Sequence, residues 1–106
     1  MARGLFVVRA EVADAADRAA FDRWYTTDHL PFALSEFGAL RAWRFWSRSD
    51  PAIHYAFYEF ADVEKAQALI GSQTLKRLIE DFDRAWGKRV ARSREILEFA
   101  EEVRAG

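Results

Sequence analysis

The stretch LRAWRFWSRSDPAIHYAFYEF, residues 40–60, predicts a β-hairpin around which the rest of the chain can be arranged. Two runs rich in aromatic residues, 40–46 and 53–60, flank a cluster of turn-forming residues at 47–51, which is typical of two strands joined by a short connection. Because successive side chains of a strand point to opposite faces, Trp43 and Trp46 must lie on different faces. We therefore expect a sheet that is apolar on both sides.

Strand-like and helix-like patterns alternate on either side of this hairpin. Residues 5–12 predict a first strand and residues 90–99 a last one, although the charges after Arg94 would also suit a helix. Helical patterns fill the two intervals, as pieces at 14–31 and 32–37 before the hairpin and at 63–70 and 73–86 after it. Pro31 has no backbone donor, so we expect it to end or kink the first helix just after His29.

The order β-α-β-β-α-β predicts an α+β fold of the ferredoxin-like type, in a single domain that spans residues 1–106. In this fold both helical layers cover one face of a four-stranded antiparallel sheet. The uncovered face would carry aromatic and aliphatic side chains over an area that soluble monomers rarely expose. We therefore expect a homodimer in which two sheets pack face to face.

Composition and charge exclude several classes of function. With 16 basic and 17 acidic residues the net charge is -1, which gives no general attraction to nucleic acid or to an anionic membrane. The chain has no cysteine and two histidines that lack a metal-ligand spacing, so we expect neither a metal site nor a cofactor. The apolar run at residues 5–8 is too short for a signal peptide or a membrane span, and we expect a cytoplasmic protein.

The stretch Phe-Asp-Arg-Trp-Tyr-Thr-Thr-Asp-His-Leu-Pro, residues 21–31, is the candidate site. Tyr25 and His29 are four residues apart, so they lie on the same face of a helix. His29 could act as a general acid or base on a small hydrophobic substrate, or it could simply bond a carbonyl at a helix end. Tyr25 could donate a hydrogen bond to an enolate oxygen, or it could be a core residue.

Further residues are candidates for substrate binding, and each also has a purely structural explanation. Trp24 and Trp43 could form apolar walls of a pocket, or be plain core residues. Asp28 could act as a carboxylate near His29, although neighbours in sequence do not face each other on a helix. His54 could reach the cleft from its strand, or lie on the surface. Four arginines on expected strands could bind a substrate carboxylate or form ion pairs with glutamates: Arg41, Arg44, Arg92 and Arg94.

The sequence resembles the dimeric α+β barrel superfamily, and within it the EthD-like branch. The resemblance rests on the aromatic-x-x-x-His-x-Pro element of residues 25–31, on the hairpin at 54–62 and on the segment 82–87, and it extends over nearly the whole chain. EthD-like sequences commonly have Trp four residues before the His, where this chain has Tyr25. Relatives across the superfamily include cofactor-free monooxygenases, polyketide cyclases, an isomerase and haem-binding enzymes, and the resemblance implies His29 as a cleft residue.

Together these observations favour a homodimeric, cofactor-independent enzyme with a small-molecule cleft between the sheet and the first helix. It would be an isomerase, cyclase, lyase or monooxygenase-like protein acting on a small hydrophobic or polyketide-like substrate. His29 would be the acid/base and Tyr25 the hydroxyl donor. The alternative is a non-catalytic homodimer that binds a ligand or serves a structural role.

Overall fold

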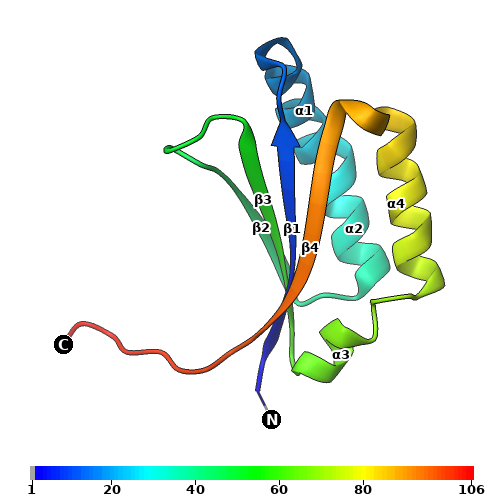
Figure 1. The fold of residues 1–106 in the computed structure, drawn as a ribbon. Helices are drawn as coiled ribbons and strands as arrows, with labels where there is room; N and C mark the ends of the chain where they lie inside the picture. The colour runs from blue at the N-terminus through cyan, green and yellow to red at the C-terminus, as the bar shows by residue number, and fades with distance from the viewer. Residues whose placement is uncertain (1) are drawn as a thin grey trace.

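The computed structural model describes residues 2–106 and contains one four-stranded antiparallel sheet. Its strands are β1 Gly4–Val12, β2 Arg41–Trp46, β3 Ile53–Phe60 and β4 Val90–Glu98. Their order across the sheet is β2-β3-β1-β4 (Figure 1). This is the ferredoxin-like arrangement, which confirms the predicted fold, including a last strand rather than a helix.

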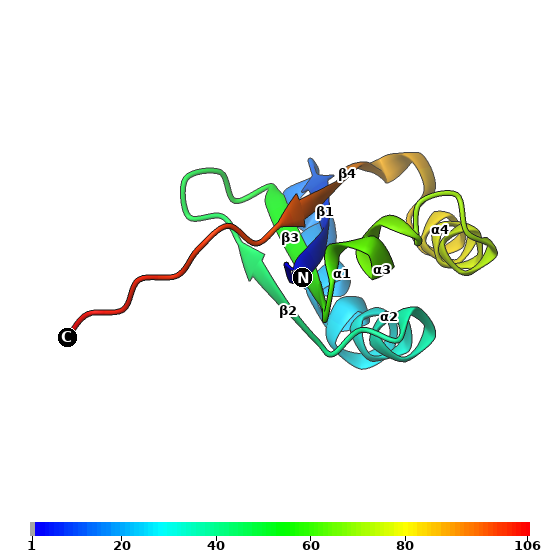
Figure 2. The same cartoon turned by 90° about the horizontal axis from the view of Figure 1, so that it is seen from below.

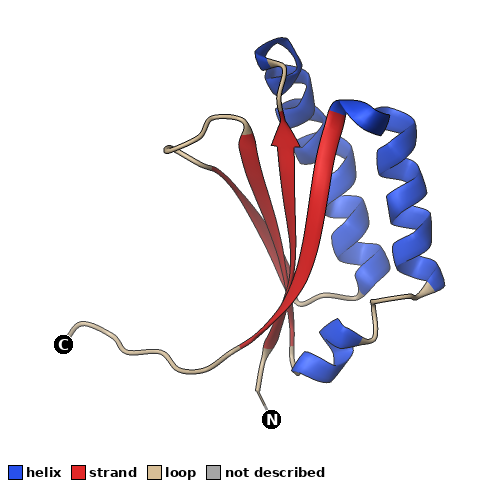
Figure 3. Cartoon of the chain, viewed as in Figure 1, coloured by secondary structure: helices blue, strands red, loops and turns tan. Residues whose placement is uncertain are grey.

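The helices lie on one side of the sheet (Figure 3). Before the hairpin the chain forms η1 Ala15–Asp17, α1 Arg18–Trp24, the π-helix η2 Tyr25–His29 and α2 Leu30–Phe37. After it come α3 Val63–Gln67, α4 Gln73–Ala85 and η3 Gly87–Arg89. Seen from below, α2 and α4 are neighbours on the same side of the sheet, and the C-terminal tail runs away on the other (Figure 2). Within residues 2–106 no helix is both long enough and apolar enough to cross a bilayer.

Of the two effects expected of Pro31, an end or a kink of the first helix, the helix end does not occur. The chain stays helical from Arg18 to Phe37, and the segment before the proline widens into the π-helix η2. Proline cannot donate to the carbonyl four residues earlier and its ring crowds that carbonyl. The π-helical turn directly before Pro31 alters the hydrogen-bond pattern at this point of the helix. The left-handed Gly38, with φ of 66°, ends α2 as predicted.

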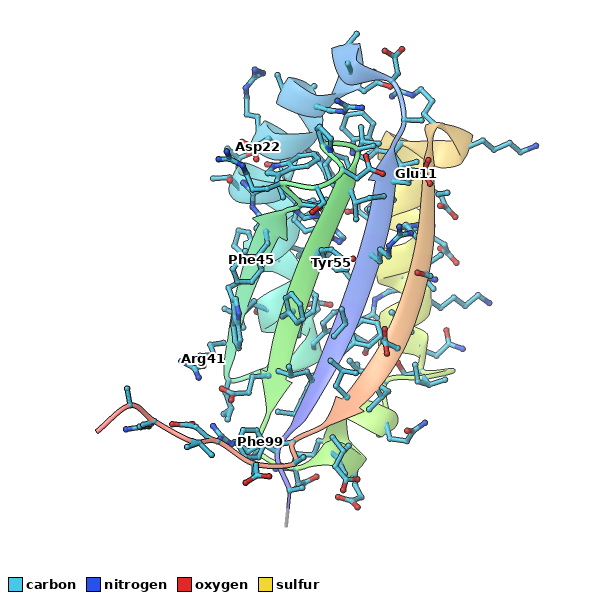
Figure 4. All side chains as sticks on the ribbon, turned by 60° about the vertical axis from the view of Figure 1, so that its left-hand side comes forward. Glu11, Asp22, Arg41, Phe45, Tyr55 and Phe99 are labelled. Atoms are coloured by element: carbon cyan, nitrogen blue, oxygen red, sulfur yellow. The ribbon has the colours of Figure 1, made fainter. Side chains whose placement is uncertain are left out.

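Alternation along the strands separates a helix-covered face from an open face. On β1, Phe6, Ala10 and Val12 are fully buried beneath the helices. The open face carries the opposite set of side chains, with Phe45 still 51% exposed and Tyr55 partly exposed (Figure 4). Around Phe57 its aromatic rings pack on one another, with Trp43 at 6.2 Å, Phe45 at 5.6 Å and Tyr55 at 6.2 Å between ring centroids. Both faces are thus apolar, as the sequence predicts.

Gly4 at the start of β1 allows α3 to approach the sheet closely. A Cβ atom at this position would lie 2.6 Å from the Cα of Val63, a distance at which backbone must move. We expect Gly4→Ala to lower the free energy of unfolding by about 1–3 kcal/mol, as overpacking usually does. Urea unfolding measures this, with Gly106→Ala as the control because a Cβ there meets nothing within 4 Å. An unchanged Gly4→Ala variant would contradict the close contact.

Candidate functional site

A small cavity lies between the covered face of the sheet and the helical layer. Its volume is about 20 Å³, close to the space of one water molecule. Most of its wall is apolar, formed by Phe6, Val8, Phe37, Leu75, Leu78, Ile79 and Phe82. The side chains with polar groups that line it are Tyr25, His29, Tyr58, Arg92 and Arg94. Its lining, apolar with a few convergent polar groups, is of the kind found in small-molecule sites, but such sites usually have volumes of about 300–1,000 Å³, so this cavity would have to open to admit a ligand.

His29 reaches this cavity from the last residue of the π-helix η2. It is 6% exposed, and Trp24 stacks on its ring with centroids 4.5 Å apart and planes at 15°. Burial lowers the pKa of His29 from 6.5 to about 4, against a smaller opposing effect of Asp81. Its Nδ1 lies 3.8 Å from Oδ2 of Asp81, too far for a hydrogen bond. The imidazole is therefore neutral at pH 7 and able to accept a proton.

Two buried tyrosines supply hydroxyl donors to the same cavity. Tyr25 lies next to His29, with ring centroids 5.0 Å apart, and Tyr58 comes from β3. Both are 1% exposed, and burial raises the pKa of each phenol well above its ordinary value. Both phenols thus keep their protons at neutral pH, which is the form that can stabilise a developing enolate oxygen.

Two arginines close the cavity on the side of β4. Arg92 pairs with Asp83 and lies over the ring of Phe82, its Cζ 4.0 Å from the ring centroid. Arg94 also lines the cavity and is partly buried. Burial lowers the pKa of both guanidinium groups, and the charge of Arg92 lowers that of Arg94 further.

His54 belongs to a different polar cluster, behind Tyr25. It is fully buried, and its Nε2 lies 3.3 Å from Nη1 of Arg44. The carboxylate of Asp22 accepts hydrogen bonds of 2.8 Å from Trp46 Nε1 and from Arg44 Nη1, which hold the pKa of Asp22 below its usual range. Burial lowers the pKa of His54 to about 3, with the Arg44 charge adding to the effect. This cluster ties the first helix to the hairpin.

The sequence-predicted candidates thus fall in different places. Tyr25 and His29 line the cavity, and Trp24 supports His29 from outside it. Asp28 is exposed and not part of the cavity wall. His54 is buried in the polar cluster just described.

Trp43 lies on the open face of the sheet, away from His29. There it lines a second hollow of about 340 Å³ at the foot of the C-terminal tail, with Leu5, Leu97 and Phe99 among its neighbours. Of the four arginines, Arg41 forms the predicted type of ion pair, with Glu59 at 2.7 Å. No cluster of three or more metal-ligating side chains occurs in the part of the chain that the structure describes.

The cavity also uses residues that the sequence did not single out. Tyr58, Phe37 and Phe82 look like ordinary core residues in the sequence, whereas Arg92 and Arg94 were among the four arginines considered for carboxylate binding, and both line the cavity. The signal that could have found Tyr58 is its position on β3, directly opposite Phe6 on the covered face. That Arg94 forms no ion pair could not be predicted from the sequence.

The chain shares its ferredoxin-like fold with several solved structures. A scan of family models and a search of curated proteins both return no match. Among solved structures, an EthD family protein from Bacillus halodurans has a TM-score of 0.65 at 19% identity, over 97% of this chain and 100% of that chain.

Two proteins from Nitrosomonas europaea share this fold as well. One, of unknown function, has a TM-score of 0.63 at 24% identity, over 100% of this chain and 98% of its own. The other, an antibiotic-biosynthesis-monooxygenase-like protein, has a TM-score of 0.62 at 18% identity, over 92% and 89% of the two chains. These neighbours confirm at the level of the fold the resemblance inferred from the sequence.

Proposed function

We propose that the chain is a cofactor-independent enzyme that moves a proton on a small hydrophobic substrate bound between the helices and the sheet. The observation that carries this proposal is the convergence of a neutral imidazole and two protonated phenols on one apolar cavity. Perturbed titratable groups in a cleft are a mark of functional sites. The monooxygenase-like neighbour is in keeping with chemistry on small molecules, although the shared fold alone does not fix a reaction.

The geometry suits abstraction of a proton next to a carbonyl group. His29 would accept the proton, the electrons of the C–H bond would move toward the carbonyl oxygen, and Tyr25 or Tyr58 would donate a hydrogen bond to that oxygen. Return of the proton to another carbon would complete an isomerisation. Alternatively, the enolate carbon would attack a second carbonyl carbon, and the alkoxide formed as its C=O π bond opens would take the proton back from His29, which completes a cyclisation. A site of this type needs no bound metal, because the phenols stabilise the negative charge.

We also propose that two copies associate through the open face of the sheet. The aromatic cluster around Phe57 and the half-exposed Phe45 and Leu97 give this face the apolar character of an interface core. Arg9 and Glu11 of β1 bring opposite charges to the same face, and a two-fold axis would allow such groups to pair across the interface.

The test uses 2-tetralone, a neutral bicyclic ketone whose α-hydrogens exchange with solvent. We expect the protein to accelerate exchange of these hydrogens in D2O, followed by NMR, and His29→Phe to lose at least about a hundredfold of the acceleration. Phenylalanine keeps the stacking on Trp24 but removes the proton acceptor. Asp28→Asn, on the exposed side of the same helix, is the control and should exchange at the normal rate.

Two outcomes would contradict the proposal. If 2-tetralone binds but exchanges no faster than in buffer, the cavity is a ligand-binding site without catalysis. If His29→Phe keeps the full acceleration, the proton acceptor is another group. His29→Ala is a poorer test, because removing a ring that is 6% exposed leaves a void that would destabilise the protein by itself.

A further inference from the structure

Among the partly buried strand arginines, Arg94 differs from Arg44 and Arg92 in forming no ion pair. Arg41 pairs with Glu59, Arg44 with Asp22 and Arg92 with Asp83. Within residues 2–106 the guanidinium of Arg94 forms no ion pair, no side-chain hydrogen bond and no stacking contact with an aromatic ring. It is partly buried and lines the same apolar cavity as His29. A guanidinium withdrawn from water costs free energy unless an anion accompanies it.

The same contrast shows which side chain at the cavity can move. The guanidinium of Arg92 is held by an ion pair with Asp83 and by stacking of its face on the ring of Phe82. The guanidinium of Arg94 has neither of these contacts. β4 is an edge strand of the sheet, so an arginine that swings outward from it meets solvent rather than another strand. A ligand larger than one water molecule requires the cavity of about 20 Å³ to enlarge, and Arg94 is the lining arginine without an anchor that would have to move.

We infer that Arg94 binds the carboxylate of an anionic, largely hydrophobic substrate and holds the rest of that molecule against the cavity wall. This inference rests on the proposed function and specifies the substrate class of the same site. A planar guanidinium fits a carboxylate with two parallel hydrogen bonds, which fixes the orientation of the bound molecule as well as its charge. Phe37 and Ile79 belong to the wall that would receive its apolar part.

An anionic ligand at this position would also affect the proton acceptor. Burial leaves His29 with a pKa of about 4, which makes it a weak base. A negative charge nearby favours the protonated imidazole and raises its pKa. A substrate carboxylate would thus both occupy the anion site and bring the base closer to the pH at which general bases are most effective.

The experiment compares 2-naphthoate with 2-naphthamide, which have the same shape but differ in charge, by titration calorimetry. We expect the folded wild-type protein to bind naphthoate at least about tenfold more tightly than the amide, the usual size of a charge-assisted advantage. Arg94→Met should remove this preference while leaving the amide affinity within about twofold. Arg94→Lys should keep part of it, because charge remains while the bidentate geometry is lost.

Arg48→Met is the control for the change of net charge, because Arg48 is exposed in the β2–β3 turn. It should leave the preference intact. Equal affinities in the wild type, a preference that survives Arg94→Met, or no binding of either compound would each overturn the anion site. If 2-tetralone exchange still depends on His29 in any of these cases, the proposed function stands without it.

Discussion

Replacement of Phe57 by arginine is expected to convert the proposed dimer into a monomer. Phe57 lies at the centre of the aromatic cluster on the open face, within 6.2 Å of the Trp43, Phe45 and Tyr55 ring centroids. An arginine there would bring a charge from each copy into the apolar face proposed as the interface, where neither has a partner. We expect the dissociation constant of the dimer to rise at least about a hundredfold, which is typical when a residue at the centre of an interface is replaced. Sedimentation equilibrium measures it against a chain mass of 12.3 kDa.

Phe32→Arg is the matched control for this substitution. Phe32 is 45% exposed and lies on α2, on the helical side of the sheet, so the same change of side chain should leave association intact. Phe45→Arg gives a second readout if Phe57→Arg disturbs the protomer, because Phe45 is already 51% exposed. A wild-type protein that sediments as a single chain at tens of micromolar would contradict the dimer.

Acid is expected to weaken the fold well before the carboxylates titrate. Burial lowers the pKa of His29 to about 4 and that of His54 to about 3, while both are near 6.5 in the unfolded chain. As the pH falls below 6.5 the unfolded state binds two protons that the folded state does not accept. The free energy of unfolding is therefore highest above pH 6.5 and should drop by about 4 kcal/mol between pH 8 and pH 5.

Urea unfolding at fixed protein concentration and several pH values measures this loss. In the double variant His29→Phe/His54→Phe the free energy of unfolding should be nearly constant between pH 8 and pH 5. Each single variant should lose about half as much free energy of unfolding over this range as the wild type. Asp22 acts outside this window, because its pKa lies below 3.8 and its contribution is lost only in stronger acid. An undiminished slope in the double variant would show that the histidines are not buried as neutral rings.

The topology and the two apolar faces could be predicted from the sequence because they depend on local patterns. Alternation at residues 53–60 gave β3 with its bounds, and Gly38 marked the end of α2. The helix end expected at Pro31 does not occur, for a physical reason. A proline favours a helix end in isolation, but here the aromatic residues on both sides of it bury against the core, and the helix continues past the proline after a π-helical turn.

The site could be predicted only in part. Tyr25 and His29 are neighbours on one helix face, so their shared location follows from a spacing of four residues. Trp43 could not be assigned to a face, because both faces of β2 carry aromatic residues. The lack of a partner for Arg94 depends on where every nearby carboxylate points. That is a property of the packed chain, and no residue pattern specifies it.

The central claim is that the covered cavity, and not the hollow on the open face, binds the substrate. The most direct test is an NMR titration of the protein with 2-tetralone, with assigned backbone and aromatic signals. We expect the shifted signals to come from Tyr25, His29 and Tyr58, on the helix-covered side of the sheet. Shifts confined to Trp43, Leu97 and Phe99, around the hollow on the open face, would contradict it.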